Sequence, residues 1–256
     1  MVVHGMQGHV WVLLEDATWM CSSGLMQMDV HGMRGSAAYG GNLEILKFAH
    51  ENGCPWDART CATAAEHGHL EVLKWARKKG CPWDERTCSY AARCGYSDVI
   101  EWARGNGCPW NEHTCHTAAE FGHLHTLKWA RANGCPWNSQ TCAKAVRNGH
   151  LEILKWCREN GCPWGEGTCA SAAKGGHLEI LKWARENGCP WDDWTCLRAA
   201  QHGHLDVLKW AHANDCQWDA RQVYRYAEAC TSGKKAEVIH WLRTTGDVIP
   251  RDPESP

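Results

Sequence analysis

A tryptophan recurs every 27 residues along most of this chain, usually within a Cys-Pro-Trp unit. A fixed period of roughly 20–50 residues is typical of repeat proteins, in which each copy is one small supersecondary unit. Such a unit cannot bury its own apolar face, so neighbouring copies must stack to form a continuous core. The tryptophans of the series are Trp56, Trp83, Trp110, Trp137, Trp164, Trp191 and Trp218.

The first half of each copy predicts a short helix with a polar N-cap. The carboxylate of Asp57 can accept the free backbone amides of a first helical turn, and a helix is predicted over 58–67. Gly68 follows, and glycine commonly ends helices because it adopts the left-handed conformation past the C-terminus. Asn or Asp recurs at the capping position in further copies, with Gly165 as the exception: Asp84, Asn111, Asn138, Asp192 and Asp219.

The second half of the same copy predicts a second helix, over 69–79. Leu70, Leu73 and Ala76 recur at the spacing of one helix face, whereas Arg77 is expected to face water. A glycine and a proline follow, where proline prevents the helix from continuing. No alternating strand pattern occurs within the repeats. The sequence therefore predicts an all-α fold, an α-solenoid of stacked helix-turn-helix repeats.

The repeat resembles the ankyrin repeat in several spaced positions. It has the pair Ala64-Ala65, then the run Gly-His-Leu-Glu-Val-Leu-Lys from Gly68, and a further glycine at Gly80. Ankyrin units are typically about 33 residues long, whereas these have 27. The missing residues fall where the family has a projecting β-hairpin finger, so the resemblance implies an ankyrin stack whose fingers are reduced to a turn. The pattern covers most of residues 36–216 and recurs around Gly95, Gly122, Gly149, Gly176 and Gly203.

The chain is predicted to consist of three segments, which differ in how closely their sequence follows the 27-residue repeat pattern. Residues 1–34 are interpreted as a degenerate N-terminal cap or a disordered lead, because they echo the repeat only faintly. Residues 35–246 are predicted to form the ankyrin-like solenoid, whose end repeats need a polar outer face. Residues 247–256 are predicted to be a flexible tail.

The net charge and the hydropathy of the chain bear on whether it binds nucleic acid, enters a membrane or is secreted. A net charge of −2 argues against the basic surface that nucleic acid requires. The longest strongly apolar run, 10–14, is far too short to span a bilayer, and the first basic residue is Arg34, so the basic start of a signal peptide is missing. We therefore expect a cytoplasmic or nuclear monomer with no signal peptide, transmembrane segment, nucleic-acid partner or membrane partner.

Most of the 17 cysteines follow the repeat in two series. Equivalent residues of stacked helices lie about 8–10 Å apart, whereas a disulfide needs Cα atoms within about 7 Å. Neither series can therefore pair along itself, and buried cysteine behaves as a small hydrophobic residue. Within the repeats, three cysteines break the series and are the predicted candidates for an exposed reactive thiol: Cys94, Cys157 and Cys230.

The sequence contains few of the motifs that indicate catalysis, metal binding or cofactor binding. No Cys-x-x-Cys pair of the kind common in structural zinc sites occurs, and there is no glycine-rich phosphate loop or nucleophile elbow. The recurring histidines, such as His69, match the ankyrin pattern, which implies that they serve the turn. We therefore predict no enzyme activity, no catalytic or metal-binding residues and no cofactor. A Cys/His-rich metal-binding or redox-sensing repeat protein is the alternative function.

Four positions of the first helix vary between copies, whereas the glycines, alanine pairs, tryptophans and cysteines recur. The resemblance implies that first helices line a concave face that contacts a protein partner, as in a scaffold or adaptor. Tyr90 and Phe121 are predicted aromatic anchors, a type frequent at interface hot spots. A basic half, from Lys144 onward, is predicted to prefer an acidic segment of the partner. The predicted partner-binding residues are Thr63, Glu66, Tyr90, Arg93, Thr117, Glu120, Phe121, Lys144, Arg147, Ser171, Lys174, Arg198 and Gln201.

Overall fold

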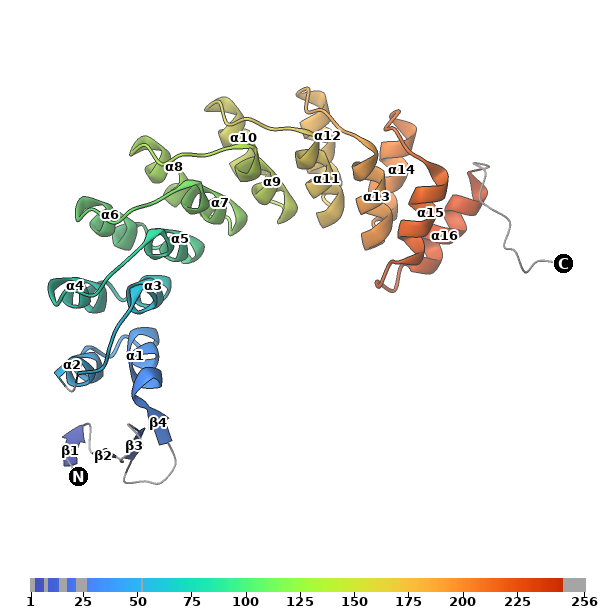
Figure 1. Cartoon of the computed structure of the whole chain (residues 1–256). Coiled ribbons are helices and arrows are strands. Elements are labelled where there is room, and N and C mark those ends of the chain that lie inside the picture. The colour runs from blue at the N-terminus through green and yellow to red at the C-terminus, as the bar shows by residue number, and fades with distance from the viewer. Residues whose placement is uncertain (1–2, 7–8, 14–17, 22–26, 52, 246–256) are drawn as a thin grey trace. The chain divides into compact units, whose positions relative to one another are not determined.

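The computed structural model describes the backbone of residues 3–6, 9–13, 18–21, 27–51 and 53–245. This part of the chain holds four strands followed by sixteen helices (Figure 1). The chain divides into two compact units. Unit 1 comprises residues 1–114 and 128–130, and Unit 2 comprises residues 115–127 and 131–256.

The four strands precede the repeats and pair into one antiparallel sheet in the order β1-β2-β3-β4. From the sequence we expect a degenerate cap or a disordered lead over 1–34, and the strands are not predicted. Strand runs of three to five residues are too short to show a clear alternation in the sequence. That this segment caps the stack stays a prediction. The strands are β1 (Val3–Met6), β2 (His9–Leu13), β3 (Thr18–Cys21) and β4 (Gln27–Asp29).

Helix pairs make up the rest of Unit 1. In each pair the odd-numbered helix is the first helix of a repeat and the even-numbered helix is the second. The helices predicted over 58–67 and 69–79 are confirmed to within one residue at each end, as α3 and α4. The helices that lie wholly in Unit 1 are α1 (Val30–Tyr39), α2 (Leu43–Glu51), α3 (Ala58–Glu66), α4 (Leu70–Lys78), α5 (Glu85–Cys94) and α6 (Ser97–Gly105).

The same helix pairs continue into Unit 2, where the first helices α9, α11, α13 and α15 pack against one another in succession (Figure 1). Helices α7 (Glu112–Glu120) and α8 (Leu124–Ala132) contain residues of both units. The helices that lie wholly in Unit 2 are α9 (Ser139–Arg147), α10 (Leu151–Glu159), α11 (Glu166–Gly175), α12 (Leu178–Glu186), α13 (Asp193–His202), α14 (Leu205–Ala213), α15 (Ala220–Glu228) and α16 (Lys235–Thr244).

Side-chain caps explain where the first helices begin. Asp57 Oδ1 accepts a hydrogen bond from the backbone amide of Arg59 at 3.0 Å, and Asp84 does the same for Arg86 at 3.0 Å. The predicted cap at Asp192 is wrong in this respect. Its side chain makes no capping hydrogen bond, and its Oδ1 is buried without a hydrogen-bond partner in the described part of the chain. Capping bonds of the same kind form at Asn111, Asn138 and Asp219.

The core is the apolar stripe of the second helices against the alanine pairs of the first helices. In the copy of α3 and α4, Leu73, Ala76, Ala64 and Ala65 are all fully buried. Small alanines let the two helices approach closely, and each buried leucine stabilises the fold by roughly 1.5–3 kcal/mol. Fully buried leucines recur at the position of Leu73 in other copies: Leu46, Leu127, Leu154, Leu181 and Leu208.

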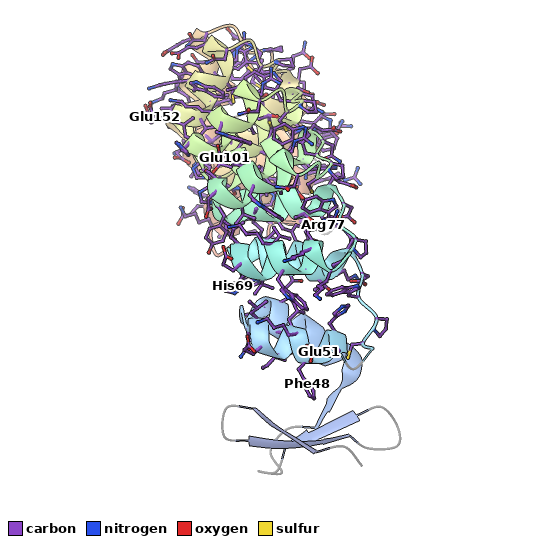
Figure 2. All side chains as sticks on the ribbon, turned by 90° about the vertical axis from the view of Figure 1, so that its left-hand side faces the viewer. Phe48, Glu51, His69, Arg77, Glu101 and Glu152 are labelled. Carbon is purple, nitrogen blue, oxygen red and sulfur yellow. The ribbon has the colours of Figure 1, made fainter. Side chains whose placement is uncertain are left out.

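Arginine and tryptophan form a contact that the sequence analysis did not predict. Arg77, expected in water, places its guanidinium carbon 4.0 Å from the centroid of the Trp83 ring and donates a hydrogen bond to the Cys81 carbonyl. Figure 2 shows Arg77 near the end of α4 that faces this turn. A cation over an aromatic face is attracted by the ring quadrupole, so the arginine fixes the tryptophan at the turn. The contact recurs at Arg104, Arg131, Arg158 and Arg185.

The recurring histidines join one repeat to the next. His177 Nε2 donates to the Arg147 carbonyl at 3.1 Å, and His204 Nε2 donates to the Lys174 carbonyl at 3.1 Å. Because the acceptor is a carbonyl oxygen, Nε2 must carry the proton. Each bond satisfies a carbonyl at the end of the preceding first helix, where helices leave such groups unpaired. The histidines therefore have a structural role between repeats.

Candidate protein-interaction face

The predicted partner-binding residues of Unit 1 lie on α3 and α5. Glu66 and Arg93 form an ion pair with 3.2 Å between Oε1 and a guanidinium nitrogen. Tyr90 is 37% exposed, and Thr63 is half-buried with its carbonyl accepting from His67. The opposite charges on neighbouring helices neutralise each other, so this stretch carries little excess charge for a partner.

In Unit 2 the structure separates Lys144 from the rest of the predicted basic half. Lys144 Nζ on α9 lies 3.0 Å from the carboxylate of Glu120 on α7, so its charge is already compensated. Thr117, also on α7, is half-buried. Phe121 follows α7 directly and is 43% exposed, as an anchor for a partner would need to be.

The other three basic residues converge on one pocket across α9, α11 and α13. Its volume is about 320 Å³. Four predicted residues, one or more from each helix, therefore share one depression in the first-helix face. The residues around it are Gln140, Ala143, Arg147, Gly167, Ala170, Ser171, Lys174, Asp192, Trp194 and Arg198.

The charges in this pocket repel one another. The nearby Arg147 guanidinium, with smaller contributions from burial and from Arg198, lowers the pKa of Lys174 below its ordinary value. Burial, followed by the charge of Lys174, lowers the pKa of His202 at the end of α13. None of the three basic residues forms an ion pair within the described part of the chain; Arg198 donates to the neutral Gln201 side chain at 2.8 Å.

An exposed tryptophan that the sequence analysis missed lies beside these cations. Trp194 is 42% exposed, and the Arg198 guanidinium carbon is 5.0 Å from its ring centroid. The Tyr226 ring meets it edge-on at 6.0 Å. The sequence did contain a signal for Trp194. It is the second residue after the cap residue Asp192, and no other copy has a tryptophan at that position. The other copies have Arg59, Arg86, His113, Gln140, Gly167 and Arg221 there.

Gln201 does not share the basic pocket. It lines a neighbouring depression together with Gln222, Arg225, Tyr226 and Ala229, from α15 and the residue that follows it. The predicted residues of Unit 2 thus fall into an ion-paired group on α7 and α9, a basic pocket on α9, α11 and α13, and Gln201 beside α15.

Two of the three cysteines that break the two series differ from the prediction. Cys94 is exposed as expected, but Cys157 and Cys230 are buried. Cys157 stands on the buried stripe of a second helix, at the position of Ala76 in α4, so its departure from the series does not place it at the surface. In the series themselves, the neighbouring Cys81 thiol and burial raise the pKa of Cys61.

Comparison with known proteins supports the repeat assignment. A family model described as ankyrin repeats (many copies) matches residues 115–161 and 169–212. The crystal structure of the human ASB11 ankyrin repeat domain is similar over 61% of this chain and 84% of that chain, with 16% sequence identity and a TM-score of 0.50. At this identity the likeness concerns the fold alone. No curated protein matches the chain in sequence.

Ankyrin repeats are generally protein–protein interaction modules, and the fold is typically a non-enzymatic binding scaffold. Within the described residues, no helix combines the length and apolar character needed to cross a membrane. Three observations support the same assignment to ankyrin repeats. They are the spacing of alanine pairs, glycines and histidines, the pairs of helices, and the matched family model. The repeats of residues 115–161 and 169–212 belong to the ankyrin repeat family.

Proposed function

We propose that this chain is a protein-interaction module whose first-helix face in Unit 2 binds an acidic segment of a protein partner. The observation that carries the proposal is the set of three cations around one pocket, Arg147, Lys174 and Arg198. None of them forms an ion pair in the described residues, although the Asp192 carboxylate also lines the pocket. Closely spaced like charges destabilise one another. An anionic group of a partner would be attracted by all three cations and would relieve their repulsion. Trp194 and Phe121 supply exposed rings for apolar contact.

The geometry favours a peptide-like segment as the occupant. The pocket opens across three first helices. Its lining includes one aromatic ring, one hydroxyl, three cations and one carboxylate, that of Asp192, whose pKa is raised by burial. Arginine recognises a carboxylate through two parallel hydrogen bonds, which adds geometric selectivity to the charge attraction. An acidic residue followed or preceded by an apolar residue would therefore meet complementary groups on α9, α11 and α13.

The test is selection from a random peptide library on the immobilised protein. We expect the wild type to enrich peptides that combine Asp or Glu with an aromatic or apolar residue. The variant Arg147→Glu/Lys174→Glu/Arg198→Glu should lose them. Circular dichroism should first show that all variants keep their helices. Enrichment of peptides without acidic residues, or equal enrichment by the triple variant, would refute the proposed site.

A matched control is available in the Glu120–Lys144 pair. The double variant Glu120→Lys/Lys144→Glu reverses both charges, keeps the ion pair and leaves the net charge unchanged. We expect it to retain the selected peptides. Single-stranded nucleic acid serves as a second probe: binding of it by the wild type as tight as that of the selected peptides would point to general anion attraction instead of peptide recognition.

A further inference from the structure

One repeat of Unit 2 places three thiols together, whereas the other copies place two. The copies from α3 to α14 each have one cysteine on the first helix and one in the turn after the second helix; here these are Cys142 on α9 and Cys162 after α10. Cys157 on α10 is the added thiol. The other copies have alanine at the position of Cys157: Ala49, Ala76, Ala103, Ala130, Ala184 and Ala211.

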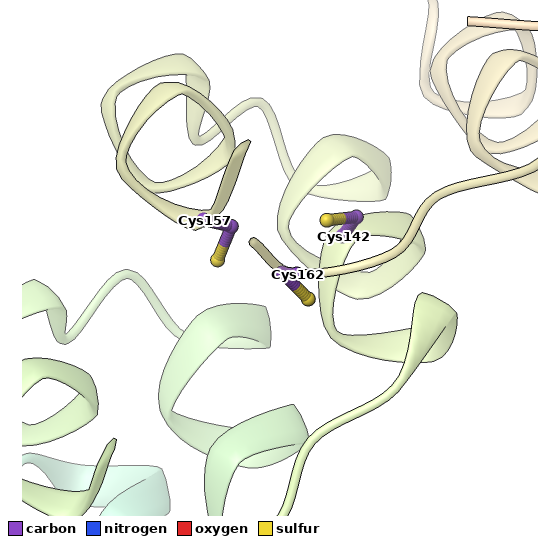
Figure 3. Close-up of side chains that lie close together, drawn as sticks. All are labelled: Cys142, Cys157 and Cys162. Carbon is purple, nitrogen blue, oxygen red and sulfur yellow. The ribbon is translucent and has the colours of Figure 1, made fainter. Parts of the chain in front are cut away.

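The three sulfur atoms form a compact buried cluster. The Sγ atoms of Cys142, Cys157 and Cys162 all lie within 4.8 Å of one another, and all three residues are fully buried. Figure 3 shows the cluster between α9, α10 and the turn that follows α10. Three atoms with this spacing lie within about 2.8 Å of a common point, and Zn–S bonds are about 2.3 Å long. Small side-chain shifts would bring all three sulfurs to bonding distance.

The surroundings suit a divalent thiophilic cation. Three thiolates and one divalent ion carry a net charge of −1, which is costly in a buried site unless it is compensated. Arg158 supplies a positive charge: its guanidinium donates to the Cys162 carbonyl at 2.6 Å and acts electrostatically on Cys142. A monovalent ion such as Cu⁺ would leave a larger uncompensated charge. Thiolate sulfur is a preferred ligand of zinc.

Zinc in structural sites is almost always four-coordinate, so a fourth donor is needed. Thr141 Oγ1 is buried and interacts with the Cys162 thiol, so it is an oxygen that the repeat offers as a fourth ligand. The same hydroxyl is also buried at Thr87, Thr114 and Thr195. What sets this repeat apart is therefore the third thiol, while the threonine oxygen is a donor that the repeat already provides.

We infer that Cys142, Cys157 and Cys162 form a zinc site inside the repeat of α9 and α10. When Zn²⁺ binds, three Zn–S bonds form and the three thiol protons pass to solvent. Because the site is buried, the ion enters during folding or when α10 and its turn open locally. The bound ion links α9 to α10 and stabilises this repeat. The site is separate from the basic pocket, so its presence does not depend on the proposed peptide binding.

The repeat itself supplies the matched variants. Cys157→Ala restores the alanine of the other copies and is expected to keep the fold, and Cys157→Ser keeps the size of the side chain. Ala184→Cys adds a third thiol beside Cys169 and Cys189 in the next copy, and so creates a second cluster of the same kind. Circular dichroism under reducing conditions checks that all four proteins keep their helices.

The experiment is a Zn²⁺ titration of the reduced, metal-free full chain against a chromophoric chelator, with Cd²⁺ and its thiolate absorption band as a second probe. We expect one tightly bound ion in the wild type, at least about 100-fold weaker binding in both Cys157 variants, and two ions in Ala184→Cys. Equal affinity of the wild type and Cys157→Ala would overturn the site. A folded Ala184→Cys protein that binds no second ion would overturn the argument that three thiols in this geometry suffice.

Discussion

Lys144 and Arg147 lie on the same helix, α9, but within the described residues only Lys144 forms an ion pair, with the Glu120 carboxylate 3.0 Å away. Arg147, one turn further along, instead faces the basic pocket with Lys174 and Arg198. Both residues belong to the predicted basic half, and the structure divides them by what each already contacts.

Arg147→Ala should weaken binding of an acidic peptide by about tenfold or more, because a lost charged hydrogen bond costs about 1.5–3 kcal/mol. Lys144→Ala should change the affinity by less than threefold, because the Lys144 ammonium group is already paired with the Glu120 carboxylate. Fluorescence anisotropy with a selected acidic peptide, at two salt concentrations, measures both. A larger effect from Lys144→Ala than from Arg147→Ala would contradict the assignment of the pocket.

Arg185→Ala should lower the free energy of unfolding by about 1 kcal/mol. The change removes a cation held 4.3 Å from the Trp191 ring centroid, and such contacts contribute roughly 0.5–2 kcal/mol. Urea denaturation followed by tryptophan fluorescence gives the difference. The control is Lys182→Ala on the same helix, which removes only a surface ion pair with Glu179 and should cost less than about 0.5 kcal/mol.

His177→Ala should destabilise the contact between two adjacent repeats by about 1–3 kcal/mol. The substitution removes the bond from Nε2 to the Arg147 carbonyl and leaves that carbonyl without its partner. Amide hydrogen exchange should show faster opening around α9 and α12. His240→Ala, at an exposed position of α16, is the control and should change exchange little.

Asp84 and Asp192 should respond to pH in opposite directions. The hydrogen bond from Arg86 lowers the pKa of Asp84, so its stabilisation is present above the unfolded-state pKa and is lost as pH falls through the folded-state pKa. Asp84→Ala should therefore cost about 1 kcal/mol at pH 7 and less at pH 3. Urea titrations at the two pH values test this.

Burial raises the pKa of Asp192, with contributions from Glu166 and Asp193. Here the folded state holds the proton more tightly, so stability is lost as pH rises from the unfolded-state pKa through the folded-state pKa. Asp192→Asn should remove this loss and leave the protein as stable as the wild type, or more stable, at pH 7. A loss of stability at pH 7 similar to that of Asp84→Ala would show that Asp192 does act as a cap.

Among the cysteines whose side chains the structure describes, Cys94 should react first with a thiol-alkylating reagent. It is exposed, whereas the other described cysteines are buried, and alkylation requires access as well as thiolate. Mass spectrometry of the native reduced protein after a short pulse should find the label on Cys94 and not on Cys157. Denaturation in urea before labelling is the control that exposes every thiol.

Much of the scaffold could be predicted from the sequence because each copy repeats the same local signals. Gly68 and its equivalents end the first helices, and Leu73 and its equivalents mark the buried stripe, so a single copy defines the others. The side of the first helix that varies was also visible by comparing copies. The prediction that Arg77 faces water was wrong. Its charge favours a solvent-exposed position in a sequence-based prediction, whereas its contact with Trp83 exists only once the turn has folded back over the helix.

Sequence alone determined the period, the helix pairs and the resemblance to ankyrin repeats, since these follow from glycine, alanine, leucine and tryptophan at fixed intervals along one chain. Tertiary structure decided which charges remain unpaired and which thiols meet. Lys144 and Glu120 are 24 residues apart in sequence, and Cys142 and Cys162 belong to different elements of one repeat. Such contacts depend on side-chain direction across packed helices, which a spacing rule along the chain does not contain.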